Sequence, residues 1–370
     1  MWWFRKPNAL PQSAYYRPLH NLWLAVHFHL FGLNPVGWHL MKVLLHVGAV
    51  ALCFRLAQLL TQDVSAALAT ALLFGLMPLH AQPMASINAL GEERSATFEL
   101  GALCVLIHAK GKPWHGLSGA LALFAAALLS HESTVTFPLA IGAYVLLLER
   151  HQEGRTQPVP RQMPPLARRW LAAMLWSVPF SALALAYIGV RAMVLKGSQI
   201  LASPLDRVTL VAVNGGRQID VRVTADGLGR LLTTLPATLV RYLEMLAFPW
   251  LAGPTQNIKF VTTLDWRAFY QPAAILLLLA VLGWVGLRNS PRRNLYLFCF
   301  AWWLVALAPA LNLNGLAGVV MLGNPNPPLV QDRYLYLGHS ASAGWPATGQ
   351  RGLRVLRPST WPPCPPPQSC

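Results

Sequence analysis

Residues 272–287 read PAAILLLLAVLGWVGL, with no charged side chain anywhere in the run. Four other stretches contain no acid and almost no base, namely 65–79, 116–130, 170–190 and 295–311. An α-helix rises 1.5 Å per residue, so about 20 apolar residues cross a ~30 Å hydrocarbon core. Backbone polar groups find no water in hydrocarbon, and a helix satisfies them within one segment. These runs therefore predict helices that cross a membrane.

The composition supports the same class of protein. Charged residues make up 11% and apolar residues 55% of the 370 residues, and the mean hydropathy is +0.43. Ordinary soluble domains carry about 25% charged residues. A soluble domain of this length could not bury so much apolar surface and keep so few charges facing water. We therefore predict an all-α fold, a polytopic transmembrane bundle of about eight or nine membrane helices.

The formal net charge of +16 would also suit a protein that binds nucleic acid. The arginines and lysines, however, lie in short loops between apolar runs, as at Arg288–Arg293. Membrane proteins place such basic loops on the cytoplasmic side, so we expect no nucleic-acid partner. The five cysteines are scattered and form no CxxC pair, which argues against both a disulfide framework and a zinc site.

Basic loops also predict which segments face which side. Residues 149–169 and 288–294 are rich in arginine and are expected in the cytoplasm. This arrangement requires residues 233–251 to lie at the interface or re-enter the membrane instead of crossing it. The number of helices between the loops then places these segments on the outer face: 1–36, 80–95, the 131–132 turn, 191–232 and 312–337.

One membrane domain is predicted over 1–337, with an outer-face insert at about 191–232. Within this insert, VTLVAVNGGRQIDVRVTADG (208–227) has β-branched residues on both sides of an Asn-Gly-Gly turn. That pattern predicts a small β-hairpin outside the membrane. Residues 338–370 contain Pro and Gly throughout and no apolar run, so they are expected to form a disordered tail.

The predicted outer face gathers most of the acids and the bases that could pair with them. Ionisable residues at membrane depth are expensive and suggest function. Carboxylates there could serve as a general base or bind a metal, and Arg or His could hold a phosphate. For each residue the alternative is an ordinary solvated loop charge. The candidates are His80, Glu92, Glu93, Arg94, His131, Glu132, Asp332, Arg333, Tyr334 and Tyr336.

Several short motifs resemble those of a known family of membrane glycosyltransferases. YRPL (16–19) and HLFGLNPVGWHLMKVLLH (29–46) are together similar to the motif that comes first in the sequences of that family. The others, in order, are MPLH (77–80), LLSHESTVTFPL (128–139), RYLEMLAFPWLAGP (241–254) and DRYLYL (332–337). In this order they resemble the membrane half of the transmembrane and tetratricopeptide-repeat O-mannosyltransferases and their bacterial relatives, within the C-type glycosyltransferase superfold.

The resemblance implies an enzyme of O-mannosylation or a related transfer, which takes a sugar from a polyprenyl-phosphate donor to a protein or glycan acceptor on the outer face. Among the candidates, the catalytic carboxylates would be Glu92, Glu93 and Glu132. The substrate-binding residues would be Arg17, His80, Arg94, His131, Asp332, Arg333 and Tyr336. Membrane lipid surrounds the chain, in the cytoplasmic membrane of a bacterium or the endoplasmic reticulum of a eukaryote. A divalent metal could help the leaving phosphate, although no motif indicates one.

Several features depart from the family pattern. The first helix and the acidic outer loop that precede the Tyr-Arg-Pro stretch in this superfold are absent, and no acid occurs before Asp63. His131 and Lys42 replace a family lysine and asparagine, and no repeats follow Leu337. The chain therefore resembles a fragment that lacks both ends, and we expect it to transfer little or no sugar as written. A polytopic transporter, with Glu99 on its pathway, and a noncatalytic membrane remnant are the alternatives.

Overall fold

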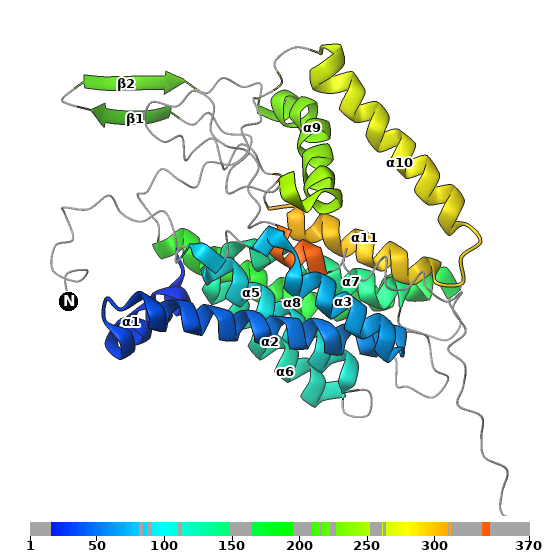
Figure 1. Ribbon diagram of the computed structural model, residues 1–370, viewed down its shortest axis with the longest axis horizontal. Helices are drawn as coiled ribbons and strands as arrows, with labels where there is room; N and C mark the ends of the chain where they lie inside the picture. The colour runs from blue at the N-terminus through cyan, green and yellow to red at the C-terminus, as the bar shows by residue number, and fades with distance from the viewer. Residues whose placement is uncertain are drawn as a thin grey trace, which may run out of the picture.

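A computed structural model describes twelve stretches of the chain. They are residues 16–80, 84–86, 90–109, 113–148, 165–194, 209–214, 217–222, 227–251, 261, 264–309, 311 and 335–340. Helices dominate the described residues, as expected from the apolar runs, and Figure 1 shows them packed side by side as a bundle.

Ten helices are described in the chain. They are α1 (Pro18–Phe31), α2 (Pro35–Thr61), α3 (Val64–Leu76), α5 (Leu90–His108), α6 (Pro113–Ser130), α7 (Phe137–Leu147), α8 (Pro165–Val194), α9 (Gly227–Ala247), α10 (Gln271–Leu287) and α11 (Arg293–Leu307). Short helical turns lie between them at Pro78–His80 (η2), Glu132–Thr136 (η4), Pro249–Leu251 (η5) and Trp266–Tyr270 (η6). Residues 335–340 form one further helical segment.

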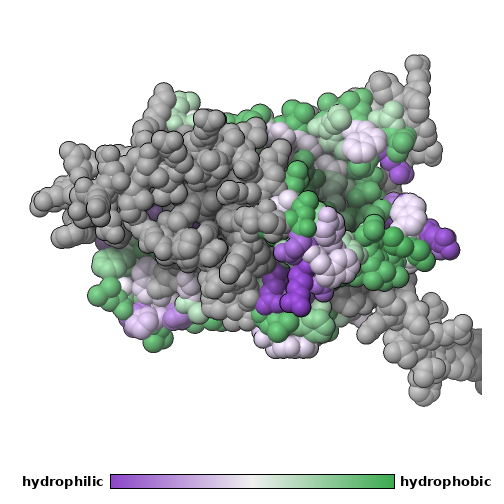
Figure 2. Space-filling model, turned by 90° about the horizontal axis from the view of Figure 1, so that it is seen from above, coloured by the Kyte–Doolittle hydropathy of each residue, from purple (hydrophilic) through white to green (hydrophobic). Residues whose placement is uncertain are grey.

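Three helices of the described chain are long and apolar enough to cross a membrane, at Pro35–Thr61, Leu166–Val194 and Trp266–Leu287. Shorter apolar helices accompany them at Val64–Leu76, His115–Ser130, Glu132–Leu147 and Arg293–Leu307. The all-α membrane bundle is therefore confirmed, and the total of eight or nine crossings stays a prediction. On α10, Leu277, Leu282 and Trp284 are more than half exposed, which suits contact with lipid. Figure 2 shows mainly hydrophobic side chains over much of the described surface seen from above.

The core lies around α5, which is buried along most of its length. Rings of Phe124, Phe137 and Phe180 from α6, α7 and α8 pack together there, with centroids 5.3 to 6.0 Å apart. At Gly119 of α6, a side-chain carbon would lie 3.1 Å from Val105 of α5. Small residues let membrane helices approach closely, where packing replaces the hydrophobic effect.

The FGLNP sequence (31–35) forms the turn between α1 and α2 and caps the start of α2. Gly32 has φ +56°, a left-handed conformation that a residue without a side chain adopts readily. Asn34 then caps α2 by accepting a hydrogen bond from the Val36 amide at 3.0 Å, with Pro35 at the first helical position. The Trp38 indole donates to the Gly32 carbonyl at 3.0 Å. These contacts fix the direction in which α2 leaves α1.

The structure refines several boundaries. The apolar run 65–79 is helical only as far as Leu76, because Met77 is extended before Pro78. The predicted strand pairing is confirmed: β1 (Thr209–Asn214) pairs antiparallel with β2 (Arg217–Arg222). Helical structure extends to Ser340, three residues past the expected start of the tail, and 341–370 lie outside the described residues.

The two ends of the bundle carry different connections. Figure 1 shows the α1–α2 turn at one end and the α10–α11 turn at the opposite end. The α10–α11 turn belongs to the basic loop 288–294, whereas the α1–α2 turn lies in the region 1–36. This separation agrees with the predicted sides of the membrane. The other basic loop, 149–164, lies outside the described residues.

We predict that cysteines placed at Leu33 and Asn289 react with an impermeant thiol reagent from opposite sides of the membrane. Leu33 is 89% exposed in the α1–α2 turn, and Asn289 is exposed in the basic turn. The measurement is labelling of intact and of opened vesicles, in a chain whose own cysteines are serine. Labelling of both positions from one side would contradict this topology.

Candidate functional site

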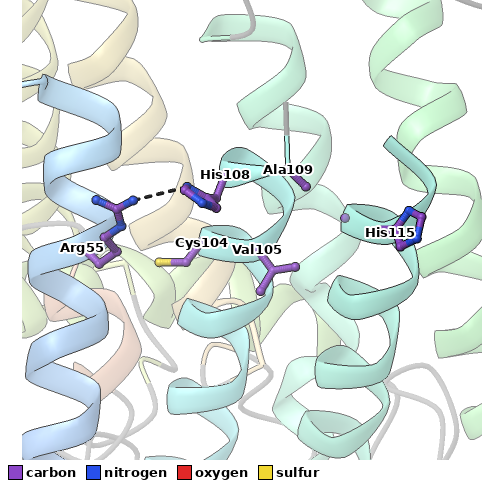
Figure 3. Close-up of a pocket in the computed structure, with 7 residues that line it drawn as sticks. Arg55, Cys104, Val105, His108, Ala109 and His115 are labelled. Atoms are coloured by element: carbon purple, nitrogen blue, oxygen red, sulfur yellow. Dashed lines mark hydrogen bonds between the residues drawn. The ribbon is translucent and has the colours of Figure 1, made fainter. Parts of the chain in front are cut away.

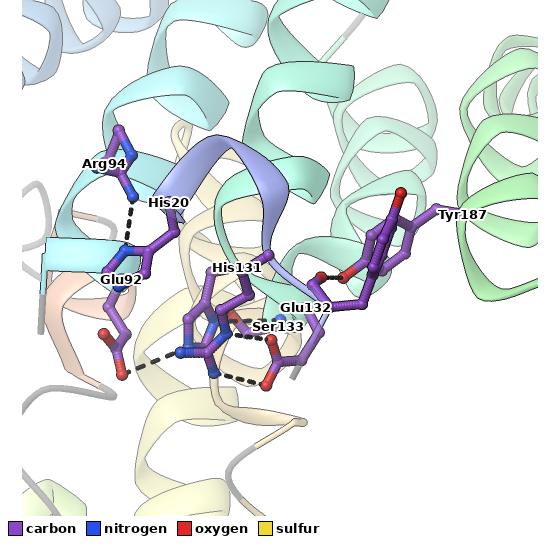
Figure 4. Close-up of polar contacts among 9 residues, drawn as sticks. His20, Glu92, Arg94, His131, Glu132, Ser133 and Tyr187 are labelled. Atoms are coloured by element: carbon purple, nitrogen blue, oxygen red, sulfur yellow. Dashed lines mark hydrogen bonds and ion pairs between the residues drawn. The ribbon is translucent and has the colours of Figure 1, made fainter. Parts of the chain in front are cut away.

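Arg17 and Glu132 form an ion pair between the start of α1 and the η4 turn. Arg17 donates from Nε and Nη2 to the two carboxylate oxygens of Glu132, at 2.6 Å each. Such a two-point contact is among the strongest polar interactions in proteins. Burial acts to raise the pKa of Glu132. The hydrogen bonds from Arg17, together with the electrostatic influence of His131 and Arg17, outweigh burial and lower that pKa to about 2. Glu132 is therefore ionised and held in a fixed orientation (Figure 4).

Tyr187 of α8 fixes the chain next to this pair. Its hydroxyl donates to the backbone carbonyl of Tyr16 at 2.9 Å, and the two rings lie 6.1 Å apart. Residues that precede α1 are thereby tied to a helix 171 positions later in the sequence. The position of Arg17 consequently depends on both the η4 turn and α8.

Arg94 lies in the first turns of α5 and is almost completely buried, at 1% exposure. Its Nη2 donates to His20 Nδ1 at 2.9 Å, and its Nε donates to Ser130 Oγ at 3.3 Å. The guanidinium also lies 5.2 Å from the centre of the Trp23 ring, which adds a cation–π attraction. Its Nη1 has no hydrogen-bond partner among the described residues.

Burial determines the charge states of Arg94 and His20. Burial lowers the pKa of Arg94 to about 10, which leaves the guanidinium cationic at neutral pH. Burial, followed by the charge of Arg94, lowers the pKa of His20 to about 4. His20 is therefore neutral and accepts the hydrogen bond from Arg94. A buried N–H without a partner costs about 1–3 kcal/mol, and more on a charged group, so Nη1 is suited to a ligand.

His131 connects the η4 turn to Glu92 at the start of α5. Its Nδ1 accepts hydrogen bonds from the hydroxyl and backbone amide of Ser133, at 2.7 and 3.3 Å. The neutral ring therefore carries its proton on Nε2, which lies 3.4 Å from Glu92 Oε1. Figure 4 shows the His131 ring between Ser133 and Glu92. The His131 ring, which Ser133 holds in place, therefore orients the Glu92 carboxylate.

Glu93 faces a different group of residues. Its side chain is fully buried, and neither carboxylate oxygen has a hydrogen-bond partner among the described residues. Burial raises the pKa of Glu93 well above its ordinary value, against the opposing charges of Lys42 and Arg94. The Lys42 ammonium itself donates to the Ser86 carbonyl at 2.5 Å. Glu93 and Lys42 thus form a buried electrostatic pair beside the Arg94 site.

A ring cluster surrounds Tyr336, which the sequence analysis singled out. The Tyr336 hydroxyl is 2.8 Å from His46 Nδ1, and the ring lies 4.6 Å from that of His80. His80 Nε2 in turn lies 3.2 Å from His339 Nδ1, and Phe74 packs against all of these rings. The cluster is buried and holds the 335–340 helix against α2 and η2. This packing explains why helical structure continues past Gly338.

The structure brings most of the expected site residues to one end of the bundle. Arg17, Glu92, Arg94, His131 and Glu132 lie in one network of contacts, whereas His80 and Tyr336 belong to the ring cluster and Glu93 pairs with Lys42. Asp332 and Arg333 lie outside the described residues, as does Tyr334. Within the described part of the chain, no group of three His, Cys, Asp or Glu side chains is arranged to hold a metal ion.

Sequence reasoning missed one central residue of the network. His20 was assigned only to an interfacial stretch, yet it accepts a hydrogen bond from Arg94. It follows Arg17 by three positions in a helix, a spacing that places both on one face. The spacing between Arg17 of the YRPL motif and His20, the residue directly after the motif, could have identified His20 as a neighbour of the site. Lys42 entered the sequence-based expectations as a replacement of a family asparagine and not as a site residue.

Comparisons with known proteins show which family of proteins this chain is similar to. The profile of a family described as dolichyl-phosphate-mannose-protein mannosyltransferase matches residues 12–160. Protein O-mannosyl-transferase Tmtc1 of Drosophila melanogaster is 30% identical over 128 residues, 34% of this chain and 15% of that protein. Protein O-mannosyl-transferase Tmtc2 of the same species is 35% identical over 112 residues, 28% of this chain and 12% of that protein.

A third relative is protein O-mannosyl-transferase TMTC2 of Mus musculus, 28% identical over 151 residues, 39% of this chain and 18% of that protein. The matches therefore span less than a fifth of the length of these curated relatives. No solved structure matches the chain. These matches confirm the resemblance to protein O-mannosyltransferases. Arg17, Arg94 and Glu132 fall inside the matched region.

We predict that the Arg17–Glu132 pair makes stability depend on pH. The pKa of Glu132 is about 2 in the fold, against about 4.5 in the unfolded chain. Its contribution is therefore fully present above pH 4.5 and is lost as the pH falls toward 2. The whole effect is at most about 3 kcal/mol. Thermal unfolding in detergent at pH 6 and pH 3 should show a smaller pH-dependent drop for Arg17→Gln than for the unchanged chain.

Glu244→Gln is the matched control for this measurement. It breaks the Arg241–Glu244 pair, in which the Glu244 side chain is 42% exposed, and exposed pairs contribute little. Its unfolding profile should follow that of the unchanged chain. Identical pH profiles for Arg17→Gln and the unchanged chain would contradict the assigned role of the buried pair.

Proposed function

We propose that this chain is the site-bearing part of a membrane glycosyltransferase, which moves a sugar from a polyprenyl-phosphate donor to a hydroxyl group of a protein or glycan on the outer face. The described family match supports mannose as the sugar and dolichyl phosphate as the class of carrier. The names of the relatives support O-linked transfer to protein. Residues 1–337 would form the membrane domain, in the endoplasmic reticulum of a eukaryote or the cytoplasmic membrane of a bacterium.

The single observation that carries the proposal is the buried Nη1 of Arg94, which has no hydrogen-bond partner in the described part of the chain. A buried guanidinium nitrogen normally finds an acceptor, and phosphate oxygens match its planar array of donors. Ser130, His20 and Trp23 already hold the rest of the side chain in place. The donor phosphate would therefore complete the surroundings of Arg94 without moving it. Such preorganised charge acts most strongly where water is excluded.

Sugar transfer requires two further events at the reacting atoms. The acceptor oxygen forms a bond to the anomeric carbon, while the bond from that carbon to the phosphate oxygen breaks and leaves its electron pair on the phosphate. Arg94 would stabilise the negative charge that develops there. The hydroxyl proton must pass to a base, and a positioned carboxylate of this kind contributes about 10²–10⁴-fold in rate. We assign this role to Glu92, which His131 orients.

Glu132 is better suited to positioning than to proton transfer. Both of its oxygens accept hydrogen bonds from Arg17, and its pKa of about 2 makes it a weak base. Glu132 would thus fix Arg17 and the η4 turn, and through the adjacent His131 it would help to place Glu92. Glu93 is directed to Lys42 instead. Of the three carboxylates expected to be catalytic, Glu92 is therefore the one we propose as the base.

We predict that Arg94→Gln weakens binding of a short-chain polyprenyl-phosphate mannose to the detergent-solubilised chain by about tenfold or more. A charge-assisted contact to phosphate is worth roughly 1.5–3 kcal/mol, which corresponds to that loss of affinity. The measurement is retention of radiolabelled donor. Arg267→Gln is the control, because it removes an exposed arginine outside the site.

Folding is checked by the unfolding temperature of each variant, since Arg94 is buried. Arg94→Lys serves as a second variant that keeps the charge but loses the planar array of donors, and it should retain intermediate affinity. Unchanged donor binding by a folded Arg94→Gln variant would contradict the proposal. Equal losses for Arg94→Gln and Arg267→Gln would show a general charge effect and contradict it as well.

A further inference from the structure

A hollow lies at the far end of α5, away from the site described above. It is lined by Arg55 of α2, by Cys104, Val105, His108 and Ala109 at the end of α5, and by His115 and Gly116 of α6, and it encloses about 540 Å³. Figure 3 shows Arg55 and His108 facing one another, with His115 on the neighbouring helix. The proposed sugar-transfer chemistry uses none of these residues.

The hollow has a basic rim and an apolar floor. Arg55, His108 and His115 are exposed, whereas Cys104 and Gly116 are buried. None of the seven lining residues from the described part of the chain is acidic. A hollow with this distribution of charge attracts an anion and offers an apolar surface beneath it.

The Arg55 side chain is held in an orientation suited to binding. Its Nη1 donates to Gln58 Oε1 at 2.7 Å, and its Nη2 donates to His108 Nδ1 at 3.2 Å. Arginine has only donors, so His108 must accept through Nδ1, and its neutral ring carries a proton on Nε2. His108 is therefore itself a donor at the rim. A guanidinium and an imidazole N–H are the groups that proteins use to bind phosphate oxygens.

The place of the hollow in the fold indicates the source of the phosphate. Helix α5 runs from Leu90, beside the Arg94 site, to His108 at the hollow. Its 19 residues span about 28 Å at 1.5 Å per residue, close to the thickness of a hydrocarbon core. If one end of α5 lies at the headgroups of one leaflet, the other end lies at the headgroups of the opposite leaflet. The basic loops predict that the hollow is on the cytoplasmic side, where anionic lipids are concentrated.

The size of the hollow also favours a lipid over a free ion. A phosphate has four oxygens, each about the size of a water molecule of ~30 Å³, and so fills no more than about a quarter of the space. The remaining volume adjoins Val105, Ala109 and the buried floor. A glycerol unit and the first carbons of an acyl chain would fit such a surface, whereas inorganic phosphate would leave it facing water.

We propose that this hollow binds the phosphate of an anionic phospholipid, with Arg55 as the principal contact and His108 and His115 at its rim. The site is separate from the proposed donor site, because it lies at the other end of α5. Its occupant would hold α2, α5 and α6 together on the cytoplasmic side.

The test uses the full chain in mild detergent, with phosphatidylglycerol and phosphatidylcholine added in turn, and native mass spectrometry to count retained lipid. We expect preferential retention of phosphatidylglycerol, and Arg55→Gln should weaken it roughly five- to tenfold. His108→Phe, which keeps a ring but removes its N–H, should weaken it less. Arg288→Gln is the matched control, because it removes another exposed arginine from the same predicted side and should leave retention unchanged.

Inorganic phosphate supplies the second arm of the test. Competition by millimolar phosphate for the Arg55-dependent retention would support phosphate as the recognised group. Binding of inorganic phosphate as tight as that of phosphatidylglycerol would overturn the lipid source in favour of a soluble ion. Equal retention of the two lipids, or equal losses for Arg55→Gln and Arg288→Gln, would overturn the site itself.

Discussion

The cost of holding a charge inside a bilayer governs where this chain keeps its ionic side chains. An ionised group at membrane depth is expensive unless it is paired or faces a polar cavity. Arg17, Arg94 and Glu132 satisfy that requirement in one network at the start of α5, joined to α1 and the η4 turn. Because the partners come from separate helices, the network also fixes how those helices pack. The Arg94 Nη1, a buried donor with no hydrogen-bond partner among the described residues, is the feature that makes it a candidate binding site.

The side chains around the two ends of α5 differ in charge and burial, so the two ends of the bundle differ chemically. Near Leu90 the charges are buried, paired and of both signs, which suits a site that must stabilise charge as a bond breaks. Near His108 the charges are basic and exposed, which suits attraction of an anion at the membrane surface. The interior between them is packed by small residues and aromatic rings such as Phe124 and Phe137. One helix thus connects a proposed catalytic face to a proposed lipid-binding face.

Much of this architecture could be predicted from the sequence because apolar length is a strong local signal. The long uncharged runs predicted the helices, and the Asn-Gly-Gly turn predicted the hairpin. The Arg17–Glu132 pair joins residues 115 positions apart, and no periodicity predicts such a contact. The predicted topology placed both residues on the outer face, and the resemblance implied that both belong to the site. The helix through Ser340 was missed because Gly338 and its neighbours are weak helix formers. Packing of His339 against His80 outweighs that preference.

An experimental structure of the chain with a bound polyprenyl-phosphate sugar would test the central claim most directly. The account predicts a phosphate oxygen within hydrogen-bond distance of Arg94 Nη1, about 2.7–2.9 Å, with Ser130 and His20 still holding the guanidinium. It also predicts that the Glu92 carboxylate lies on the side of the anomeric carbon open to an acceptor hydroxyl. A phosphate bound away from the start of α5, or an Arg94 Nη1 already satisfied by a protein group, would contradict it.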